Sequence, residues 1–206
     1  MGKDINIFHL LDHDISFDEY ELQSREINDE LAIIISEEDL IASTVLNDEH
    51  QYAYDSILQK VFSNQAGSFF IDGSGGTQKT FLYKALLATL RSKQLIAVAT
   101  ISSDVAASIL SGGGTTHLRF KILLNFDKNN TCNVSKQSGL ARLLRVAKLI
   151  IWDETLMSKK QSVGALDIML RDINNSELLF GGNIIVFCGD FRQILPVVRK
   201  STRRTI

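Results

Sequence analysis

The feature that most constrains this fold is an alternation of short apolar segments with amphipathic helical segments, starting near residue 46. Each apolar segment is rich in Ile, Val, Phe or Ala, as strands buried on both faces are. The helical segments place apolar residues three or four positions apart. This alternation predicts an α/β fold with a mostly parallel, doubly wound sheet flanked by helices. We expect strands at 68–71, 95–99, 149–152 and 183–187, and helices starting at Asn47 and spanning 79–92, 104–110, 139–146 and 161–171.

Charge is distributed unevenly along the 206 residues, although the formal net charge is only -2. Residues 1–45 hold 12 Asp and Glu against Lys3 and Arg25, whereas the remainder holds 20 Lys and Arg against 12 Asp and Glu. We expect residues 1–45 to be a weakly ordered, acidic lead-in with at most one helix or strand of its own, and residues 46–206 to form one domain. The basic domain suits a polyanionic partner, and it also suits an ordinary solvated surface.

Cysteine usage and the N-terminus indicate the cellular setting. Cys132 and Cys188 lie far apart in the sequence and outside any Cys/His cluster, so neither a disulfide framework nor a zinc site is indicated. The first residues are acidic where a targeting peptide would be basic, and no apolar run approaches the ~18 residues of a membrane span. We therefore expect an intracellular protein that has no membrane segment.

A strand, a glycine-rich turn and a helix follow one another in FFIDGSGGTQKTFLYKALLATL. The turn approximates the phosphate-binding loop GxxxxGK(S/T), in which backbone N–H groups and a helix N-terminus bind phosphate. Lys79 would add a positive charge, and Thr80 would offer a hydroxyl to Mg²⁺. Gln78 stands where the motif has glycine, at a cost of about 1 to 2 kcal/mol if the backbone there is left-handed. The other predicted contacts to the phosphates come from Gly73, Gly75, Gly76 and Thr77.

Two further strands end in polar residues, in KLIIWDETLMS and NIIVFCGDFRQILPVV. Because parallel strands share one carboxyl edge, these residues should lie beside the phosphate loop. Asp153 would hold Mg²⁺, and Glu154 would orient and deprotonate the attacking water. Asp190, Arg192 and Gln193 follow the last strand, where a polar side chain can sense a γ-phosphate.

The stretch ATISSDVAASILSGGGTTHLRFKI combines hydroxyls, charges and one aromatic ring. Ser102 and Ser103 open a predicted helix and suit a nucleic-acid phosphate. His117, Arg119 and Phe120 add charge and a ring that could stack on a base. Taken alone, these residues also fit an ordinary helix cap followed by a polar loop.

In this order, the blocks resemble the petite-integration-frequency (PIF-type) DNA helicases of superfamily one, especially plant copies related to Helitron transposon helicases. The resemblance rests on GGTxKTFLY, VAAS, RFKI, LIIWDE and GDFRQILPVV, and it covers residues 46 to about 199. It implies a single RecA-like P-loop NTPase domain, the first of two in this family. It also implies ATP and Mg²⁺ as cofactors and single-stranded DNA as partner, with 5′ to 3′ translocation.

The resemblance assigns further roles. Gln193 would sense the γ-phosphate, Asn47 would lie in the segment that grips adenine, and His50 replaces the adenine-reading glutamine. Ser102, Ser103 and the block from His117 to Phe120 fall in segments that approach DNA. The resemblance also implies roles in DNA repair, recombination and telomere maintenance, a monomeric state, and a location in the nucleus or, alternatively, the mitochondrion. Hydrolysis would depend on arginines of a second RecA-like domain, which we expect these 206 residues to lack.

Three hypotheses remain open from the sequence. The first is an ATP-binding, helicase-derived domain whose hydrolysis is impaired or depends on a partner domain. The second is a catalytically inactive, nucleic-acid-binding remnant of a transposon-derived helicase, favoured by Gln78 and His50. The third is an unrelated P-loop enzyme such as a small-molecule kinase, against which the GDFRQ block argues.

Overall fold

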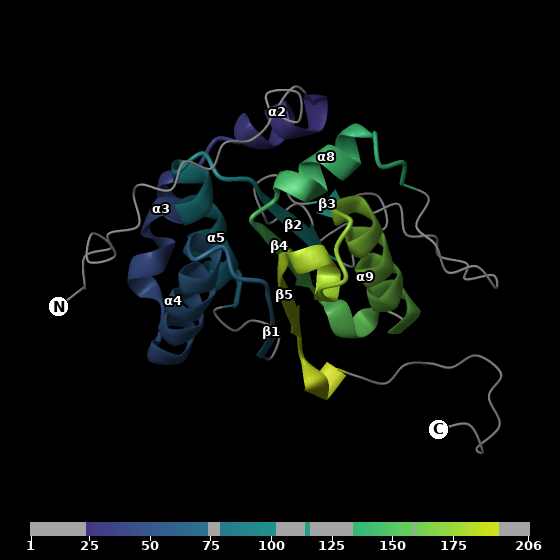
Figure 1. Cartoon of the computed structure of the whole chain (residues 1–206). Coiled ribbons are helices and arrows are strands. Elements are labelled where there is room, and N and C mark those ends of the chain that lie inside the picture. The colour runs from purple at the N-terminus through teal and green to yellow at the C-terminus, as the bar shows by residue number, and fades with distance from the viewer. Residues whose placement is uncertain (1–23, 74–78, 102–113, 116–133, 159, 194–206) are drawn as a thin grey trace, which may run out of the picture.

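Five parallel strands form one sheet in the order β1-β5-β4-β2-β3 (Figure 1). The computed structural model describes residues 24–73, 79–101, 114–115, 134–158 and 160–193. The predicted parallel sheet is therefore confirmed, with β3 as a two-residue addition at one edge. The strands are β1 (Gly67–Asp72), β2 (Ala97–Ile101), β3 (Gly114–Thr115), β4 (Leu149–Asp153) and β5 (Ile184–Gly189).

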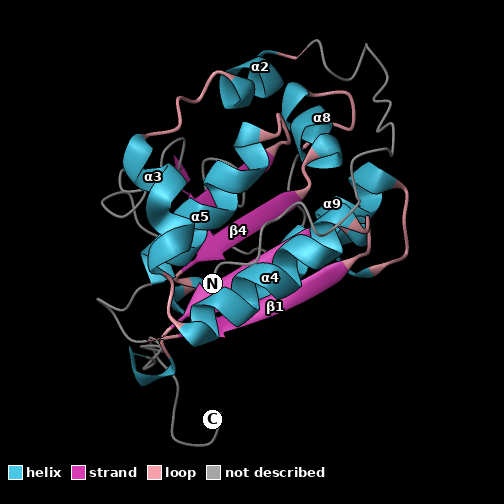
Figure 2. Ribbon diagram, turned by 90° about the vertical axis from the view of Figure 1, so that its left-hand side faces the viewer, coloured by secondary structure: helices cyan, strands magenta, loops and turns pink. Residues whose placement is uncertain are grey.

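Helices cover both faces of the sheet, with α4 (Asp48–Phe62) and α5 (Lys79–Ser92) on one face (Figures 1 and 2). The other face is covered by α8 (Gly139–Val146) and α9 (Lys160–Asn174). Successive side chains of a strand point to opposite faces. Residues of β4 accordingly alternate between the two hydrophobic clusters, and all four of its apolar side chains are fully buried. This confirms the doubly wound arrangement.

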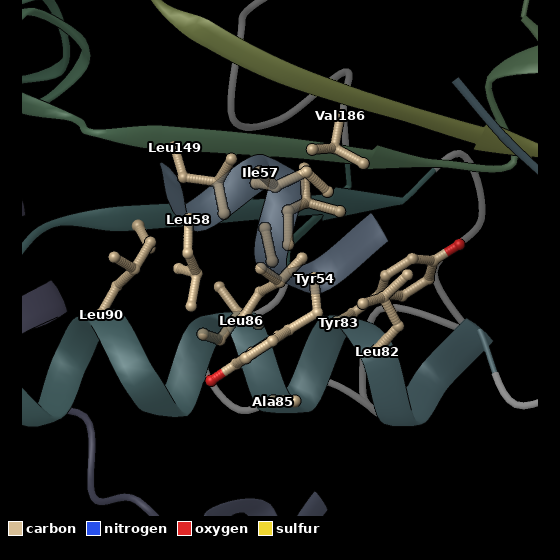
Figure 3. Packing of buried hydrophobic residues seen from close by; sticks show 14 of the residues in the cluster. Tyr54, Ile57, Leu58, Leu82, Tyr83, Ala85, Leu86, Leu90, Leu149 and Val186 are labelled. Atoms are coloured by element: carbon tan, nitrogen blue, oxygen red, sulfur yellow. The ribbon is translucent and has the colours of Figure 1, made fainter. Parts of the chain in front are cut away.

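The core on the α4/α5 face is built from helix positions spaced three or four apart (Figure 3). From α5, Leu82, Leu86 and Leu90 point toward the sheet, and Leu149 and Val186 meet them from β4 and β5. The helix α4 adds Tyr54, Ile57 and Leu58. Burying an aliphatic side chain of this size contributes about 1.5 to 3 kcal/mol, so this face holds α5 firmly against the sheet.

Helices α4, α5 and α9 end in the same way before a strand begins. Each is followed by a residue of left-handed backbone, with φ of 49° at Asn64, 57° at Gln94 and 47° at Asn175. The next N–H then bonds to a carbonyl five residues back, as Leu95 does to Leu90 at 3.0 Å. This turn takes up residues 93–95, so the strand predicted at 95–99 lies two residues later. All three turns lie at the amino edge of the sheet.

The other predicted elements agree with the structure within a few residues. The bounds of α5 and α8 are those predicted, while α9, β1 and β4 extend beyond their predicted ranges by one to three residues. The last strand starts one residue later than predicted and ends two residues later. The helix predicted at 104–110 lies outside the described residues. No described helix has both the length and the apolar character needed to cross a membrane.

From Ser24 onward, the acidic lead-in contains more helix than the single element expected. That segment forms α2 (Arg25–Leu31), α3 (Glu37–Ile41) and the short 3-10 helix η2 (Ala42–Val45). Ser24 and Ser36 cap the first two helices through their hydroxyls. Two ion pairs then attach the segment to α5, Glu30 to Arg91 at 3.4 Å and Asp39 to Lys84 at 3.2 Å. The acidic composition predicted disorder because the cations that pair with this segment, Lys84 and Arg91, lie far along the chain. Residues 1–23 lie outside the described part.

Candidate nucleotide-binding site

The carboxyl ends of β1, β4 and β5 bring several predicted site residues to one edge of the sheet. Asp72, Asp153 and Gly189 end these strands, and α5 begins at the same edge with Lys79 and Thr80. The Gly73 N–H donates to the Gly189 carbonyl at 3.0 Å, which fixes the start of the loop against β5. The remaining loop residues, Ser74, Gly75, Gly76, Thr77 and Gln78, lie outside the described residues.

Lys79 is half-buried in the first turn of α5, and its Nζ donates to the Gly189 carbonyl at 3.3 Å. The first turn of a helix carries N–H groups without helical acceptors and the positive end of the helix dipole. A cation and a helix N-terminus thus lie together at the end of β5. Thr80 follows in the same turn and is also half-buried. This arrangement suits a phosphate group.

Asp153 is held by hydrogen bonds to one of its carboxylate oxygens. The Tyr83 hydroxyl donates to Oδ1 at 3.2 Å, and the Glu154 N–H donates to the same atom at 2.9 Å. Tyr83 is fully buried, and this burial raises its pKa far above the ordinary value, so the hydroxyl stays protonated as a donor. Tyr83 is not among the site residues predicted from the sequence. Its helical spacing of four from Lys79 could have indicated that both side chains approach the same edge.

Cys188 lies beside Tyr83 in this buried layer and is fully buried itself. Burial raises the pKa of its thiol, with the negative charge of Asp153 acting in the same direction. The thiol therefore stays neutral, and it acts as a small apolar side chain behind Asp153. A neutral layer of this kind strengthens the electrostatic interactions of the carboxylate in front of it.

Glu154 has a left-handed backbone, with φ 52° and ψ 35°. Such a conformation costs a non-glycine residue about 1 to 2 kcal/mol, and it persists only where neighbours hold it. One such contact is the Thr155 hydroxyl, which donates to the Trp152 carbonyl at 2.7 Å. Burial raises the pKa of Glu154, the charge of Asp153 raises it further, and Lys79 lowers it. A carboxylate with a raised pKa accepts a proton more readily than an ordinary one.

The turn after β5 lies at the same edge. The Phe191 N–H donates to Asp72 Oδ1 at 3.2 Å, and the Arg192 N–H donates to the buried Asp190 at 2.9 Å. These bonds fix the 3-10 helix η5 (Phe191–Gln193), and Arg192 is exposed. The backbone of Gln193 is thereby beside the end of β1. The role of its side chain as γ-phosphate sensor stays a prediction.

The start of α4 agrees with the predicted cap. Asn47 Oδ1 accepts the His50 N–H at 2.8 Å. Since α4 ends at the amino edge, its start lies at the carboxyl edge, as the start of α5 does. The His50 Nδ1 is buried and has no hydrogen-bond partner among the described residues. Contact of either residue with adenine stays a prediction.

The predicted DNA contacts, Ser102, Ser103, His117, Arg119 and Phe120, all lie outside the described residues. The described part of β2 ends at Ile101, at the carboxyl edge of the sheet. Their assignment to DNA therefore stays a prediction from the sequence.

The predicted Mg²⁺ ligands fit a site completed by the nucleotide. Within the described ranges, no three His, Cys, Asp or Glu residues cluster in a way that could hold a metal ion. Mg²⁺ commonly takes only one or two protein ligands, with phosphate oxygens and water completing the octahedron. Thr80 and Asp153 match this need, because they belong to elements that end or begin at the same edge.

A parallel sheet of this order, with a lysine-threonine pair opening a helix and an Asp-Glu pair closing a strand, defines a RecA-like P-loop domain. The comparisons with known proteins identify the particular family. The PIF1-like helicase family model matches residues 45–206. The chain belongs to this family.

Curated relatives are ATP-dependent DNA helicases of the same family. The chain is 30% identical over 172 residues to the ATP-dependent DNA helicase PIF4 of Trypanosoma brucei brucei, which covers 81% of this chain and 20% of that protein. It is 32% identical over 145 residues to PIF1 of Danio rerio, covering 70% of this chain and 22% of the relative. The chain thus spans about a fifth of the length of these relatives.

Solved structures agree with this family. Unliganded Pif1 from Bacteroides sp is 26% identical, with a TM-score of 0.61 over 77% of this chain and 34% of that one. Pif1 from Candida albicans is 27% identical, with a TM-score of 0.59 over 75% of this chain and 34% of that one. A third structure, of the Bacteroides sp protein with ADP-AlF4, has a TM-score of 0.60 at 26% identity over 76% of this chain and 34% of that one.

Proposed function

We propose that this chain is the first RecA-like domain of a PIF-type, 5′ to 3′ ATP-dependent DNA helicase, and that it binds MgATP and single-stranded DNA. The observation that carries the proposal is the convergence of Lys79, Asp153 and Glu154 at one edge of the sheet, with Asp153 oriented by Tyr83. The Bacteroides Pif1 structures with ADP-AlF4 and with single-stranded DNA support both ligands.

In the proposed site, the loop from Gly73 through Gln78 surrounds the phosphates and Lys79 neutralises them. Thr80 and Asp153 would hold Mg²⁺, which when bound would supply positive charge that offsets the negative charge of the phosphates. Glu154 accepts the proton of the attacking water, for which its raised pKa is suited. Gln193 contacts the γ-phosphate, while Asn47 and His50 contact adenine.

ATP hydrolysis in related NTPases also depends on an arginine beside the γ-phosphate. An arginine that stabilises the charge developing on the γ-phosphoryl group is worth about 10³ to 10⁵ in rate in related NTPases. We propose that such arginines come from a second RecA-like domain in a longer chain, and that this chain acts as a monomer. Roles in DNA repair, recombination and telomere maintenance, in the nucleus or alternatively the mitochondrion, follow from the family.

A fluorescent MgATP titration tests the nucleotide site. Wild type and Gln78→Gly are compared with Lys79→Ala, and Lys93→Ala serves as a matched control at the opposite edge of the sheet. We expect saturable binding that falls about 10- to 100-fold in Lys79→Ala, because a hydrogen bond to a charged group contributes about 1.5 to 3 kcal/mol. Lys93→Ala should bind like wild type. Absence of saturable binding below millimolar in both wild type and Gln78→Gly would refute the proposal.

The alternative is a catalytically inactive, nucleic-acid-binding remnant, and the specific observation in its favour is Gln78 in the phosphate loop. A side chain too large for its space typically costs about 1 to 3 kcal/mol, which would weaken ATP binding about ten- to a hundredfold. Oligo-dT binding that depends strongly on salt but does not respond to ATP would favour the remnant. ATP hydrolysis stimulated by oligo-dT would favour the helicase domain.

A further inference from the structure

A polar cavity lies at the amino edge of the sheet, opposite the predicted nucleotide site. Its volume is about 210 Å³, and it opens between the turn after α4, the start of β4 and the 3-10 helix η4 (Leu179–Gly182) before β5. The polar residues that line it are two cations and four amides, namely Arg145, Lys148, Asn64, Gln65, Asn174 and Asn183. Neither the predicted function nor the family motifs account for this set.

The two cations are oriented by neighbouring groups. Lys148 Nζ donates to Asn64 Oδ1 at 3.1 Å, and an Arg145 guanidinium nitrogen donates to the Lys136 carbonyl at 3.1 Å. Both side chains are half-buried, and burial lowers the pKa of Lys148. A cation in a partly desolvated position attracts an anion more strongly than a cation in water does. A guanidinium has five donor hydrogens in a fixed fork, which matches the oxygens of a phosphate group.

The lining favours an anion. None of the described residues that line the cavity is Asp or Glu. Asp172, which lies two residues before the lining residue Asn174 on α9, pairs with Lys136 at 3.0 Å. The Asn64 oxygen already accepts from Lys148, which leaves the Asn64 NH₂ group as a donor beside Gln65. Two cations and neutral N–H donors suit an anion with several oxygens, as a phosphate group is.

The wall of the cavity is rigidly built. Asn183 is buried, and its amide donates to the carbonyls of Leu144 and Ala147 at 3.0 and 3.2 Å. Asn174 donates to the Gly181 carbonyl at 3.1 Å, so α9, η4 and the end of α8 are linked. Gly181 has φ 64°, and a Cβ there would collide with the backbone of α9. These contacts fix the shape of the cavity before any ligand arrives.

We propose that this cavity is a second phosphate-binding site, in which Arg145 and Lys148 hold a phosphate group by charge-assisted hydrogen bonds and Asn64 and Gln65 donate further bonds. The site is independent of Lys79, which lies at the other edge of the sheet. Its phosphate comes either from a small phosphorylated ligand or from a nucleic-acid backbone.

Pyrophosphate and oligo-dT are the two probes that test this site. Side-chain amide resonances of Asn64 and Gln65 are followed by NMR in wild type, Lys79→Ala, the double variant Arg145→Gln/Lys148→Gln and the charge control Arg25→Gln. Arg25 is suited to the control because its side chain is 90% exposed and lies on α2. Lys79→Ala removes the competing phosphate contact at the other edge, so failure of the proposed nucleotide site does not affect the result.

With pyrophosphate, we expect the Asn64 and Gln65 resonances to shift in wild type, Lys79→Ala and Arg25→Gln alike. The double variant should bind at least about tenfold more weakly, because it loses two charge-assisted contacts. If the natural source is nucleic acid, the double variant also binds oligo-dT more weakly. The slope of log K for oligo-dT binding against log salt concentration then falls in magnitude by about one to two. If the source is a small ligand, oligo-dT binding is unchanged while pyrophosphate binding is lost.

Two results would overturn the proposal. The first is that neither probe shifts the Asn64 and Gln65 resonances. The second is that the double variant binds pyrophosphate as tightly as Arg25→Gln does. Thermal unfolding of the double variant, measured without ligand, checks that any lost binding comes from the cavity and not from a lost fold.

Discussion

The two edges of the sheet carry opposite chemistry. At the carboxyl edge lie the carboxylates of Asp72, Asp153, Glu154 and Asp190, with Lys79 among them. At the amino edge, helices end in left-handed turns, and cations such as Arg145 and Lys148 line a cavity without carboxylates among its described residues. The difference follows from chain direction, because helices that connect parallel strands begin at one edge and end at the other.

Helix dipoles explain part of this contrast. Helix N-termini attract anions such as phosphate, and helix C-termini attract cations, each by about 0.3 to 1 kcal/mol. A cation at the amino edge can therefore have a structural role, or it can contribute to binding a ligand. Arg91 near the end of α5 is an example of the first kind, since it is buried against Glu30 and the Ala97 carbonyl. Four experiments sharpen the comparison.

The largest effect is expected from the buried cation at the amino edge. Glu30→Ala leaves the buried Arg91 without its carboxylate, which should lower the free energy of unfolding by about 3 to 5 kcal/mol. Asp29→Ala on the same helix removes an exposed pair with Arg25 and should cost at most about 0.5 kcal/mol. Urea denaturation measures both. Equal losses in the two variants would show that Arg91 is not held by a buried pair.

At the carboxyl edge, the strained backbone of Glu154 should be visible in stability. Glu154→Gly should be more stable than Glu154→Ala by about 0.5 to 1 kcal/mol, because only glycine adopts this φ without strain. In the regular helix α4, the order is expected to reverse, with Lys60→Gly less stable than Lys60→Ala by about 1 kcal/mol. The same order at both positions in urea unfolding would argue against strain at Glu154.

Tyr83→Phe tests whether Tyr83 orients Asp153 for MgATP binding or contributes only to the stability of the fold. Loss of the bond to Asp153 should cost about 1 kcal/mol of stability and weaken MgATP binding roughly fivefold. Tyr54→Phe is the matched control, because Tyr54 is buried in the same cluster and its hydroxyl bonds to Thr89 instead. It should lose similar stability and keep MgATP affinity. If the two variants bind MgATP alike, Tyr83 has no positioning role.

The smallest expected effect is a shift in the carboxyl pKa of Glu154. Its carboxyl pKa, followed by ¹³C NMR, should lie above the ordinary value of 4.5, fall in Asp153→Asn and rise in Lys79→Gln. ATP hydrolysis should fall as pH drops through this raised pKa, because the base must be unprotonated. Stability should decrease as pH rises from the ordinary to the raised value, since the folded state binds more protons there. A pKa that is the same in all three proteins would refute the assigned charges.

Much of the fold was predictable because it depends on local patterns. The spacing of apolar residues located four strands and the helices α4, α5, α8 and α9 within a few residues. The order of the motifs along the chain also predicted that the residues after β1, β4 and β5 would lie close together at the carboxyl edge of the sheet. The acidic segment before residue 46 contains more helix from Ser24 onward than was expected, because the stabilising cations Lys84 and Arg91 follow it on a helix of the domain.

By itself, the sequence determined the direction of the strands, the edge at which the candidate catalytic residues lie, and the family to which the chain belongs. Only the tertiary structure decided which side chains meet. Tyr83 and Asp153 are 70 residues apart, and Lys148 and Asn64 are 84 apart. Such pairs depend on sheet order and on the packing of helices against it, which local propensity does not encode. The orientation of Asp153 and the cavity at the amino edge are therefore properties of the folded chain.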